Sequence, residues 1–271
     1  MGKIRLYADN ACDLDTEFLQ QRQTKMFYMP VTIKDKTYRD RLTISPDEFY
    51  RLIAEPGVIP LTAQITPVEF QEEFEQVMKE SDDDIIYIAF SSGLSGTYQS
   101  ACIVRDMVNP EWITVIDSES ASVGYGLIVI KAANDIAAGK SKEEVIAGIN
   151  DYIKRIQHIF IVGSFEMLKR GGRISATSAA LLNIKLIAHF IDGKIHPLEK
   201  AHGIKKAKKR LLEVMEDRGY QLSEQLIGIN YSNDLEGALE IKKLIEEKFG
   251  CREFVISEIG AAIGSHVGAG T

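Results

Sequence analysis

Cysteine, tryptophan and histidine are scarce in this chain of 271 residues, which contains three cysteines, one tryptophan and five histidines. Cys12, Cys102 and Cys251 lie far apart and show no C-x-x-C spacing. The sequence therefore predicts neither a disulfide framework nor a zinc site, and we expect no bound metal. Three unpaired cysteines are compatible with a reducing cytoplasm.

Long apolar runs are also lacking. The most apolar stretch of the second half, residues 179–191, is interrupted by Asn183, Lys185 and His189, so we expect no membrane span. A signal peptide is not indicated, because Met1 leads almost directly into the strand-like run Ile4–Ala8. These features predict a cytoplasmic protein that is not a membrane protein.

Basic residues do not outnumber acidic residues in this sequence. The chain has 32 Lys and Arg against 39 Asp and Glu, a formal net charge of −7, which argues against nucleic acid as a partner. Hydrophobic residues make up 45% of the chain, enough to build a core at this length without disulfide bonds.

Strand-like apolar runs alternate with helical patterns in the first half of the chain. Ser45-Pro46 and Thr66-Pro67 each open a helix with a capping residue followed by proline, and a glutamate completes each capping box. The alternation predicts a parallel sheet with helices on both faces. We predict two α/β domains, an N-terminal one of residues 1–157 and a C-terminal one of residues 158–271.

Several local predictions can be compared with the structure. Residues 27–33 read as one strand, and residues 184–191 and 194–198 read as a hairpin around Asp192-Gly193. Ser175 is a candidate helix start. The glycine-rich segment Gly260–Thr271 is expected to be a loop of little bulk that carries His266.

The stretch Ile85–Ala101 is the most informative part of the sequence. The apolar run from Ile85 to Phe90 predicts a buried parallel strand, and a helix is expected to begin at Ser95 after a small polar turn. A helix start at the carboxyl edge of a sheet favours an anionic group, and a serine adds a hydroxyl donor. An ordinary capping serine explains the same pattern.

Two nucleophile or phosphate motifs are incomplete here. The nucleophile elbow needs Gly-x-Ser-x-Gly, and Thr97 stands at the position of its second glycine; no P-loop lysine follows either. A serine-dependent esterase or phosphatase that uses Ser95 with His266 therefore stays as an alternative only. His266 is the better histidine candidate because His158 and His189 lie within apolar runs.

Six segments spread over nearly the whole chain resemble the DegV family, the bacterial fatty-acid-binding proteins that serve as carrier subunits of fatty acid kinase. The segments are Asp9–Leu14, Thr62–Thr66, Ser91–Ala101, Ile116–Ser118, Lys169–Ser175 and Gly264–Thr271. The resemblance implies a two-domain α/β fold that holds a fatty acid between its domains, with the tail buried. It also implies a lipid-binding carrier rather than an enzyme, with the fatty acid as ligand and no cofactor.

The resemblance also assigns residues. Thr62, Ser95 and His266 match the positions that hold the ligand carboxylate, and Ser92 and Gly96 belong to the supporting loop. Arg173 matches the arginine thought to face the acyl phosphate that the partner kinase forms.

Elementary energetics agree with such a ligand. A tail of ~16 carbons offers on the order of 12 kcal/mol of gross burial, at about 0.8 kcal/mol per methylene, and ordering costs offset much of it. The carboxylate needs hydrogen-bond donors, because an unpaired charge is costly to bury.

One departure from the family concerns the partner. His202 stands where the family usually has an arginine implicated in docking to the ATP-binding subunit of fatty acid kinase. The basic run that begins with Lys205 and Lys206 supplies positive charge nearby, although most such runs are solvated helix faces. A lipid-sensing regulatory protein is the other alternative that the sequence leaves open.

Overall fold

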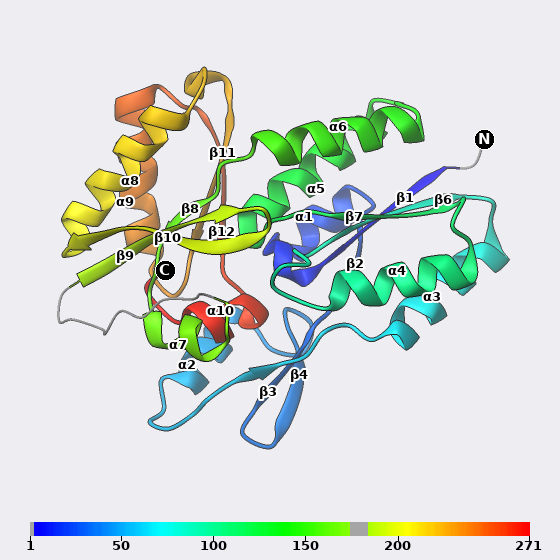
Figure 1. Ribbon diagram of the computed structural model, residues 1–271, viewed down its shortest axis with the longest axis horizontal. Coiled ribbons are helices and arrows are strands. Elements are labelled where there is room, and N and C mark those ends of the chain that lie inside the picture. The colour runs from blue at the N-terminus through cyan, green and yellow to red at the C-terminus, as the bar shows by residue number, and fades with distance from the viewer. Residues whose placement is uncertain (1–2, 174–183) are drawn as a thin grey trace.

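The computed structural model describes residues 3–173 and 184–271, so the predicted helix start at Ser175 lies outside the described residues. Its N-terminal part is built on a four-stranded parallel sheet (Figure 1). In spatial order the strands are β2 (Lys25–Phe27), β1 (Ile4–Asp9), β6 (Asp84–Ala89) and β7 (Ile113–Asp117). The predicted parallel sheet is confirmed.

Helices cover both faces of this sheet, as predicted. Figure 1 shows one helix pair on each side of it. The pairs are α3 (Pro67–Glu80) with α4 (Thr97–Val108), and α5 (Ser122–Ala137) with α6 (Lys142–Arg155). The capping box predicted at Thr66 is present, with Glu69 as its acidic partner. The short helix α1 (Thr16–Gln21) follows β1 and the 3-10 turn η1 (Asn10–Cys12).

A small antiparallel sheet projects from the N-terminal part. It contains β3 (Pro30–Ile33), β4 (Lys36–Arg39) and β5 (Leu61–Thr62), and helix α2 (Pro46–Ile53) follows β4. The prediction of one strand over residues 27–33 is wrong, because β2 ends at Phe27 and β3 begins a new sheet. The Asn10 side chain accepts the Met29 backbone N–H at 2.7 Å, which removes that group from any strand ladder.

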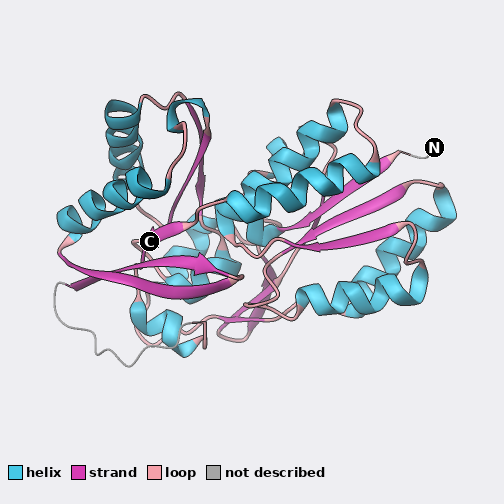
Figure 2. Ribbon diagram, turned by 45° about the horizontal axis from the view of Figure 1, so that its top comes forward, coloured by secondary structure: helices cyan, strands magenta, loops and turns pink. Residues whose placement is uncertain are grey.

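The C-terminal part contains an antiparallel sheet and a parallel strand pair. The sheet has β8 (Ile159–Ile161), β9 (Ile184–Ile191) and β10 (Lys194–His202), and it confirms the predicted hairpin. The parallel pair is β11 (Leu226–Tyr231) and β12 (Glu253–Glu258), joined through α9 (Leu235–Phe249). The remaining elements are α7 (Phe165–Arg170), α8 (Ile204–Arg218) and the 3-10 turn η2 (Leu222–Glu224). Helix α8 packs on β8, β9 and β10, and α9 packs on β11 and β12; Figure 2 shows helices beside the strands of this part.

The last segment of the chain corrects a prediction. Residues 260–271 were expected to form a loop, but Ala261–Val267 is helix α10. Acidic side chains from the N-terminal part stabilise its first turn: Asp13 accepts the Gly260 N–H, and Asp40 accepts the next two N–H groups. Helix α10 contacts α2, β3 and β5 as well as α7, so it ties the two parts of the chain together.

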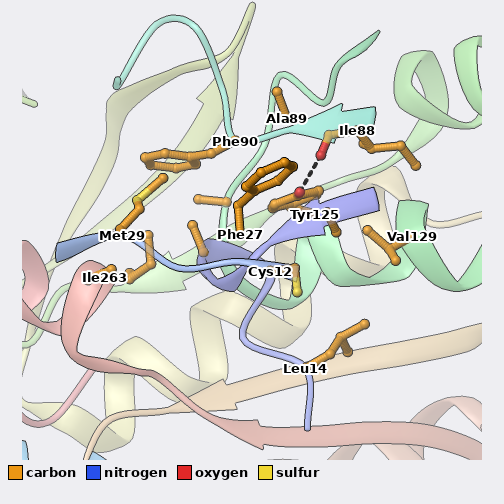
Figure 3. Close-up of a cluster of buried hydrophobic side chains, with 14 of the residues drawn as sticks. Cys12, Leu14, Phe27, Met29, Ile88, Ala89, Phe90, Tyr125, Val129 and Ile263 are labelled. Carbon is orange, nitrogen blue, oxygen red and sulfur yellow. Dashed lines mark hydrogen bonds between the residues drawn. The ribbon is translucent and has the colours of Figure 1, made fainter. Parts of the chain in front are cut away.

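The largest hydrophobic cluster among the described residues covers both faces of the parallel sheet, and Figure 3 shows the part around Tyr125 of α5. Tyr125 of α5 is fully buried there and donates its hydroxyl to the Ile88 carbonyl of β6. Met29, Phe90 and Ile263 lie together at one border of the cluster, where they also line a cavity. Across the two described ranges, the helices are too short or too polar to cross a membrane.

Candidate functional site

A cavity of about 1440 Å³ lies between the two parts of the chain. Apolar side chains from α5, from the segment before β8 and from β8, β9 and β11 form much of its wall. They include Leu127, Ile130, Ile156, Phe160, Phe190 and Ile229. Thr62, Ser95, Arg173 and His266 also line this cavity. With Gly96, which lines it as well, the structure places five of the residues singled out in the sequence on the wall of one cavity.

Thr62 and His266 form a direct pair at the cavity wall. Thr62 ends β5, His266 lies in the last turn of α10, and the Thr62 Oγ1 to His266 Nε2 distance is 2.8 Å. Burial lowers the pKa of His266 to about 4, and the charge of Arg173 contributes in the same direction. The imidazole is therefore neutral near pH 7 and acts as a hydrogen-bonding group rather than a fixed cation.

Ser95 lies at the start of α4, although the helix begins later than predicted. The first residue of α4 is Thr97, and Gly96 is the N-cap of this helix. Ser95 Oγ accepts the Thr97 N–H at 3.2 Å and lies 3.0 Å from Thr97 Oγ1. The Ser95 hydroxyl is thus held beside a helix N-terminus while it lines the cavity.

The space next to Gly96 is occupied by the end of another side chain. A Cβ at this position would lie 2.0 Å from Oε1 of Gln64. Gln64 in turn donates its amide to Ser100 Oγ at 2.9 Å, which connects the Thr62 loop to α4. Gln64 was not predicted as a site residue, and its position two residues after Thr62 was the available signal.

Arg173 follows α7 and lies close to His266. A Cβ on Gly171 would be 2.6 Å from His266 Nδ1 and 3.2 Å from Arg173 Nη1. Both side chains therefore lie close to the backbone of Gly171. The guanidinium donates to the Gly171 carbonyl, and burial lowers the pKa of Arg173. The predicted tight turn at the two glycines thus places this arginine beside the histidine.

Ser92 is the predicted supporting residue that does not line the cavity; its backbone N–H donates to Asp117 Oδ1 at 3.1 Å. Ser91, which was not predicted as a site residue, makes a contact with a more distant part of the sequence. Its hydroxyl donates to the Gly193 carbonyl at 2.6 Å and holds the tip of the β9–β10 hairpin against the loop before α4.

A buried polar cluster supports α10 and was missed from the sequence. Asp13 and Asp40 have no exposed surface, and Arg41 Nη2 lies 3.3 Å from Asp13 Oδ1. Burial raises the pKa of Asp13 to about 6, although the Arg41 charge opposes this shift. Asp15 caps α1, whereas Asp13 bonds to Gly260 at the start of α10.

His202, Lys205 and Lys206 lie outside the cavity wall, whereas Lys208 lines it. His202 ends β10, and Lys205 and Lys206 lie in the first turn of α8; all three side chains are exposed. Each later basic residue of the run is paired with at least one glutamate. These pairs are Lys208–Glu240, Lys209–Glu213 and Arg210–Glu199. For Lys205 and Lys206 no ion pair forms within the described part of the chain.

The arrangement has a clear chemical character. Two hydroxyl groups and a neutral imidazole lie along a cavity whose wall is mostly apolar, with one guanidinium nearby. Such a wall suits a long apolar molecule that ends in a hydrogen-bond acceptor. Within residues 3–173 and 184–271, no group of three His, Cys, Asp or Glu side chains could hold a metal ion.

Comparison with known proteins gives one consistent result. The family model described as "uncharacterised protein, DegV family" matches residues 3–271. A DegV domain-containing protein of Caldanaerobacter subterraneus subsp. tengcongensis is 36% identical over 271 residues, covering 99% of this chain and 96% of that protein.

Two solved structures are similar over nearly the full length. DegV of Bacillus subtilis, described as a fatty acid binding protein, has a TM-score of 0.89 and 32% identity, covering 100% of this chain and 97% of that one. A DegV family protein of Thermus thermophilus, described by its fatty acid binding, has a TM-score of 0.91 and 28% identity, covering 99% and 96%. The chain described here belongs to the DegV family.

Proposed function

We propose that this protein binds a long-chain fatty acid in the cavity, with the carboxylate held by Thr62, Ser95 and His266. The observation that carries the proposal is the Thr62–His266 pair, 2.8 Å apart, on the wall of a largely apolar cavity. The fatty acid binding described for the Bacillus subtilis and Thermus thermophilus relatives supports the same ligand class.

The wall chemistry matches the two ends of such a ligand. Burial of a long alkyl chain is favourable by about 0.8 kcal/mol per methylene. A carboxylate cannot enter without donors, and the hydroxyls of Thr62 and Ser95 can supply them. His266 is neutral near pH 7, so the ligand carboxylate keeps its own charge and nucleophilic character.

We further propose that the protein presents this carboxylate to a partner fatty acid kinase, which forms an acyl phosphate. Arg173 lies beside His266, and its guanidinium suits the additional charge of a phosphoryl group. The chemical step would then occur on the partner chain, and this protein would act as the carrier. The exposed cations Lys205 and Lys206, next to His202, are our proposed docking surface for an acidic patch of the kinase.

The alternative of a serine hydrolase finds less support in the geometry. His266 Nε2 is bonded to Thr62, and Ser95 Oγ is bonded to Thr97. A hydrolase would need Ser95 within hydrogen-bond reach of the histidine base, and no such bond joins them in the described structure.

Native mass spectrometry of the purified protein, followed by identification of any released ligand, tests the lipid-binding step. A mass increment equal to a fatty acid is expected, and Thr62→Ala and Ser95→Ala should reduce its occupancy. Ser92→Ala is the matched control, because this serine does not line the cavity. A protein that stays bare after incubation with a panel of fatty acids would refute the proposal.

The kinase step needs a separate measurement. The loaded protein, ATP and the ATP-binding subunit of a bacterial fatty acid kinase should together yield acyl phosphate. Affinity capture from cell lysate should recover such a kinase. Recovery of a transcriptional or membrane complex in its place would favour the lipid-sensing regulatory alternative.

A further inference from the structure

His158 is one of several polar side chains that line the cavity, and it is distinguished by its aromatic surroundings. His158 precedes β8 and borders the cavity together with Phe160 and Phe190. Its imidazole stacks on the Phe190 ring, with centroids 4.5 Å apart and an interplanar angle of 6°. A stacked, wall-forming ring has a fixed orientation, so its nitrogen atoms point in defined directions.

The two nitrogens of this ring have different surroundings. Nδ1 lies 3.2 Å from Ser120 Oγ. A Cβ at Gly124 would be 2.7 Å from the same nitrogen, so α5 closes that side of the ring. Nε2 forms no hydrogen bond with any residue that the structure describes. Burial lowers the pKa of His158 to about 4, so the neutral ring offers a hydrogen bond rather than a charge.

Two short connections relate His158 to the proposed carboxylate position. Four residues of extended chain, roughly 13 Å, separate His158 from Val162, the residue after β8. Ser164 N, two residues later, donates to the carbonyl of Val267, the neighbour of His266. At the Nδ1 side of the ring, the carbonyl of Ser120 accepts the backbone N–H of Ser91. Ser91 lies four residues before Ser95 in the sequence. A ligand anchored at His266 and Ser95 would therefore pass His158 with the middle of its chain.

We infer that His158 Nε2 recognises a hydrogen-bonding oxygen on the acyl chain. The preferred ligand is then a long-chain fatty acid that carries a hydroxyl or keto group near mid-chain. This inference rests on the proposed fatty acid binding and narrows its substrate class. A plain alkyl chain would displace water from the imidazole without replacing its hydrogen bond, whereas an oxygenated chain would replace it.

The test is a positional series on the wild-type protein. Octadecanoic acid and its hydroxy derivatives, each substituted at one position from carbon 7 to carbon 13, are compared by competitive displacement of a fluorescent fatty acid. We expect one hydroxy position to bind roughly tenfold more tightly than octadecanoic acid. Equal or weaker binding of every hydroxy acid would overturn the inference. Failure of all the acids to bind would overturn the proposed function as well.

Variants at position 158 test whether His158 causes the preference for a hydroxy fatty acid. His158→Leu should remove it while octadecanoic acid still binds, and His158→Gln should restore part of it. Phe160→Leu is the matched control, because it changes the same wall without removing a polar group. A preference that persists in His158→Leu would contradict the inference. If that variant does not fold, the imidazole ¹⁵N resonances of wild-type His158 must shift with the preferred hydroxy acid, relative to the complex with octadecanoic acid.

Discussion

The carboxylate of Asp40 accepts the backbone N–H of Ala261 at 2.8 Å, across 221 positions of sequence. Its other oxygen accepts the N–H of Ala262 and the side-chain amide of Asn10. Asp40 is fully buried and does not line the cavity, yet it fixes the start of the helix whose last turn carries His266. Asp40 is therefore a positioning residue for the proposed carboxylate site.

Asp40→Ala should lower both stability and ligand affinity. The substitution leaves three buried N–H donors without an acceptor, and we expect the free energy of unfolding to fall by about 3 kcal/mol. Urea unfolding measures this loss, and titration with a fluorescent fatty acid measures the affinity. Asp35→Ala, at an exposed hairpin turn, should change stability by less than about 0.5 kcal/mol. Similar results for the two variants would contradict the role given to Asp40.

Gly96→Ala should weaken fatty acid binding by displacing Gln64. The new methyl group would overlap Oε1 of Gln64, so this side chain would have to turn away, which breaks its hydrogen bond to Ser100 and the connection between the Thr62 loop and α4. We expect a loss of roughly tenfold in affinity, equivalent to about 1.4 kcal/mol. The double variant Gly96→Ala/Gln64→Ala removes the clash and should recover part of this loss. A double variant that binds worse than Gly96→Ala would show that space at Gly96 is not the reason for its glycine.

His266 should make the protein less stable in mild acid. Its pKa is about 4 in the folded state and 6.5 as its ordinary value, so the unfolded chain binds more protons between these limits. The contribution of His266 to the free energy of unfolding is fully present above pH 6.5 and is lost as the pH falls toward 4. The slope of this loss is at most about 1.4 kcal/mol per pH unit. His266→Gln should therefore lose less stability than wild type between pH 7 and pH 5.

Urea unfolding at several pH values makes this comparison. Burial raises the pKa of Asp9 and of Asp13 to about 6, which gives the opposite dependence on pH. Both proteins retain these two aspartates, so their contribution cancels in the difference between the two curves. Parallel curves for wild type and His266→Gln would contradict the neutral, buried state of the imidazole.

Charge reversal at Lys205 and Lys206 should separate lipid binding from partner docking. Both side chains are exposed and lie outside the cavity wall, so fatty acid affinity should stay unchanged in Lys205→Glu/Lys206→Glu. Acyl phosphate formation with the kinase subunit should fall by roughly tenfold at low salt and less at high salt. The same charge change on α9, Lys242→Glu/Lys243→Glu, is the control. Equal effects of the two double variants would argue against docking at the start of α8.

Much of the architecture was predictable because it depends on local signals. The capping residues Ser45 and Thr66 and the Asp192-Gly193 turn act within a few residues, and the structure confirms the elements they define. Helix α10 was missed because its segment is rich in glycine and its stabilising partners are distant in sequence. Asp13 and Asp40 supply the hydrogen bonds that local propensity does not.

In the candidate site too, residues in local motifs were predictable, and residues that act through distant contacts were not. Motif resemblance identified Thr62, Ser95, Arg173 and His266, and all four line one cavity. The residues that position them were missed, because Asp40 and Gln64 have no distinctive local pattern. Their importance follows from which backbone groups they meet in the fold. Ser92 was predicted as a support and does bond to a neighbouring loop, whereas the contact with the distant hairpin is made by Ser91.

The Thr62–His266 pair also has a consequence for folding. Its two members are 204 positions apart, so their contact requires closure of a loop that contains most of the chain. A partly folded chain that has formed the parallel sheet and β5 but not α10 has Thr62 and Ser95 without their histidine partner. Under the proposed function, the gain of fatty acid affinity during refolding should report the formation of α10 and should lag behind the recovery of helical content.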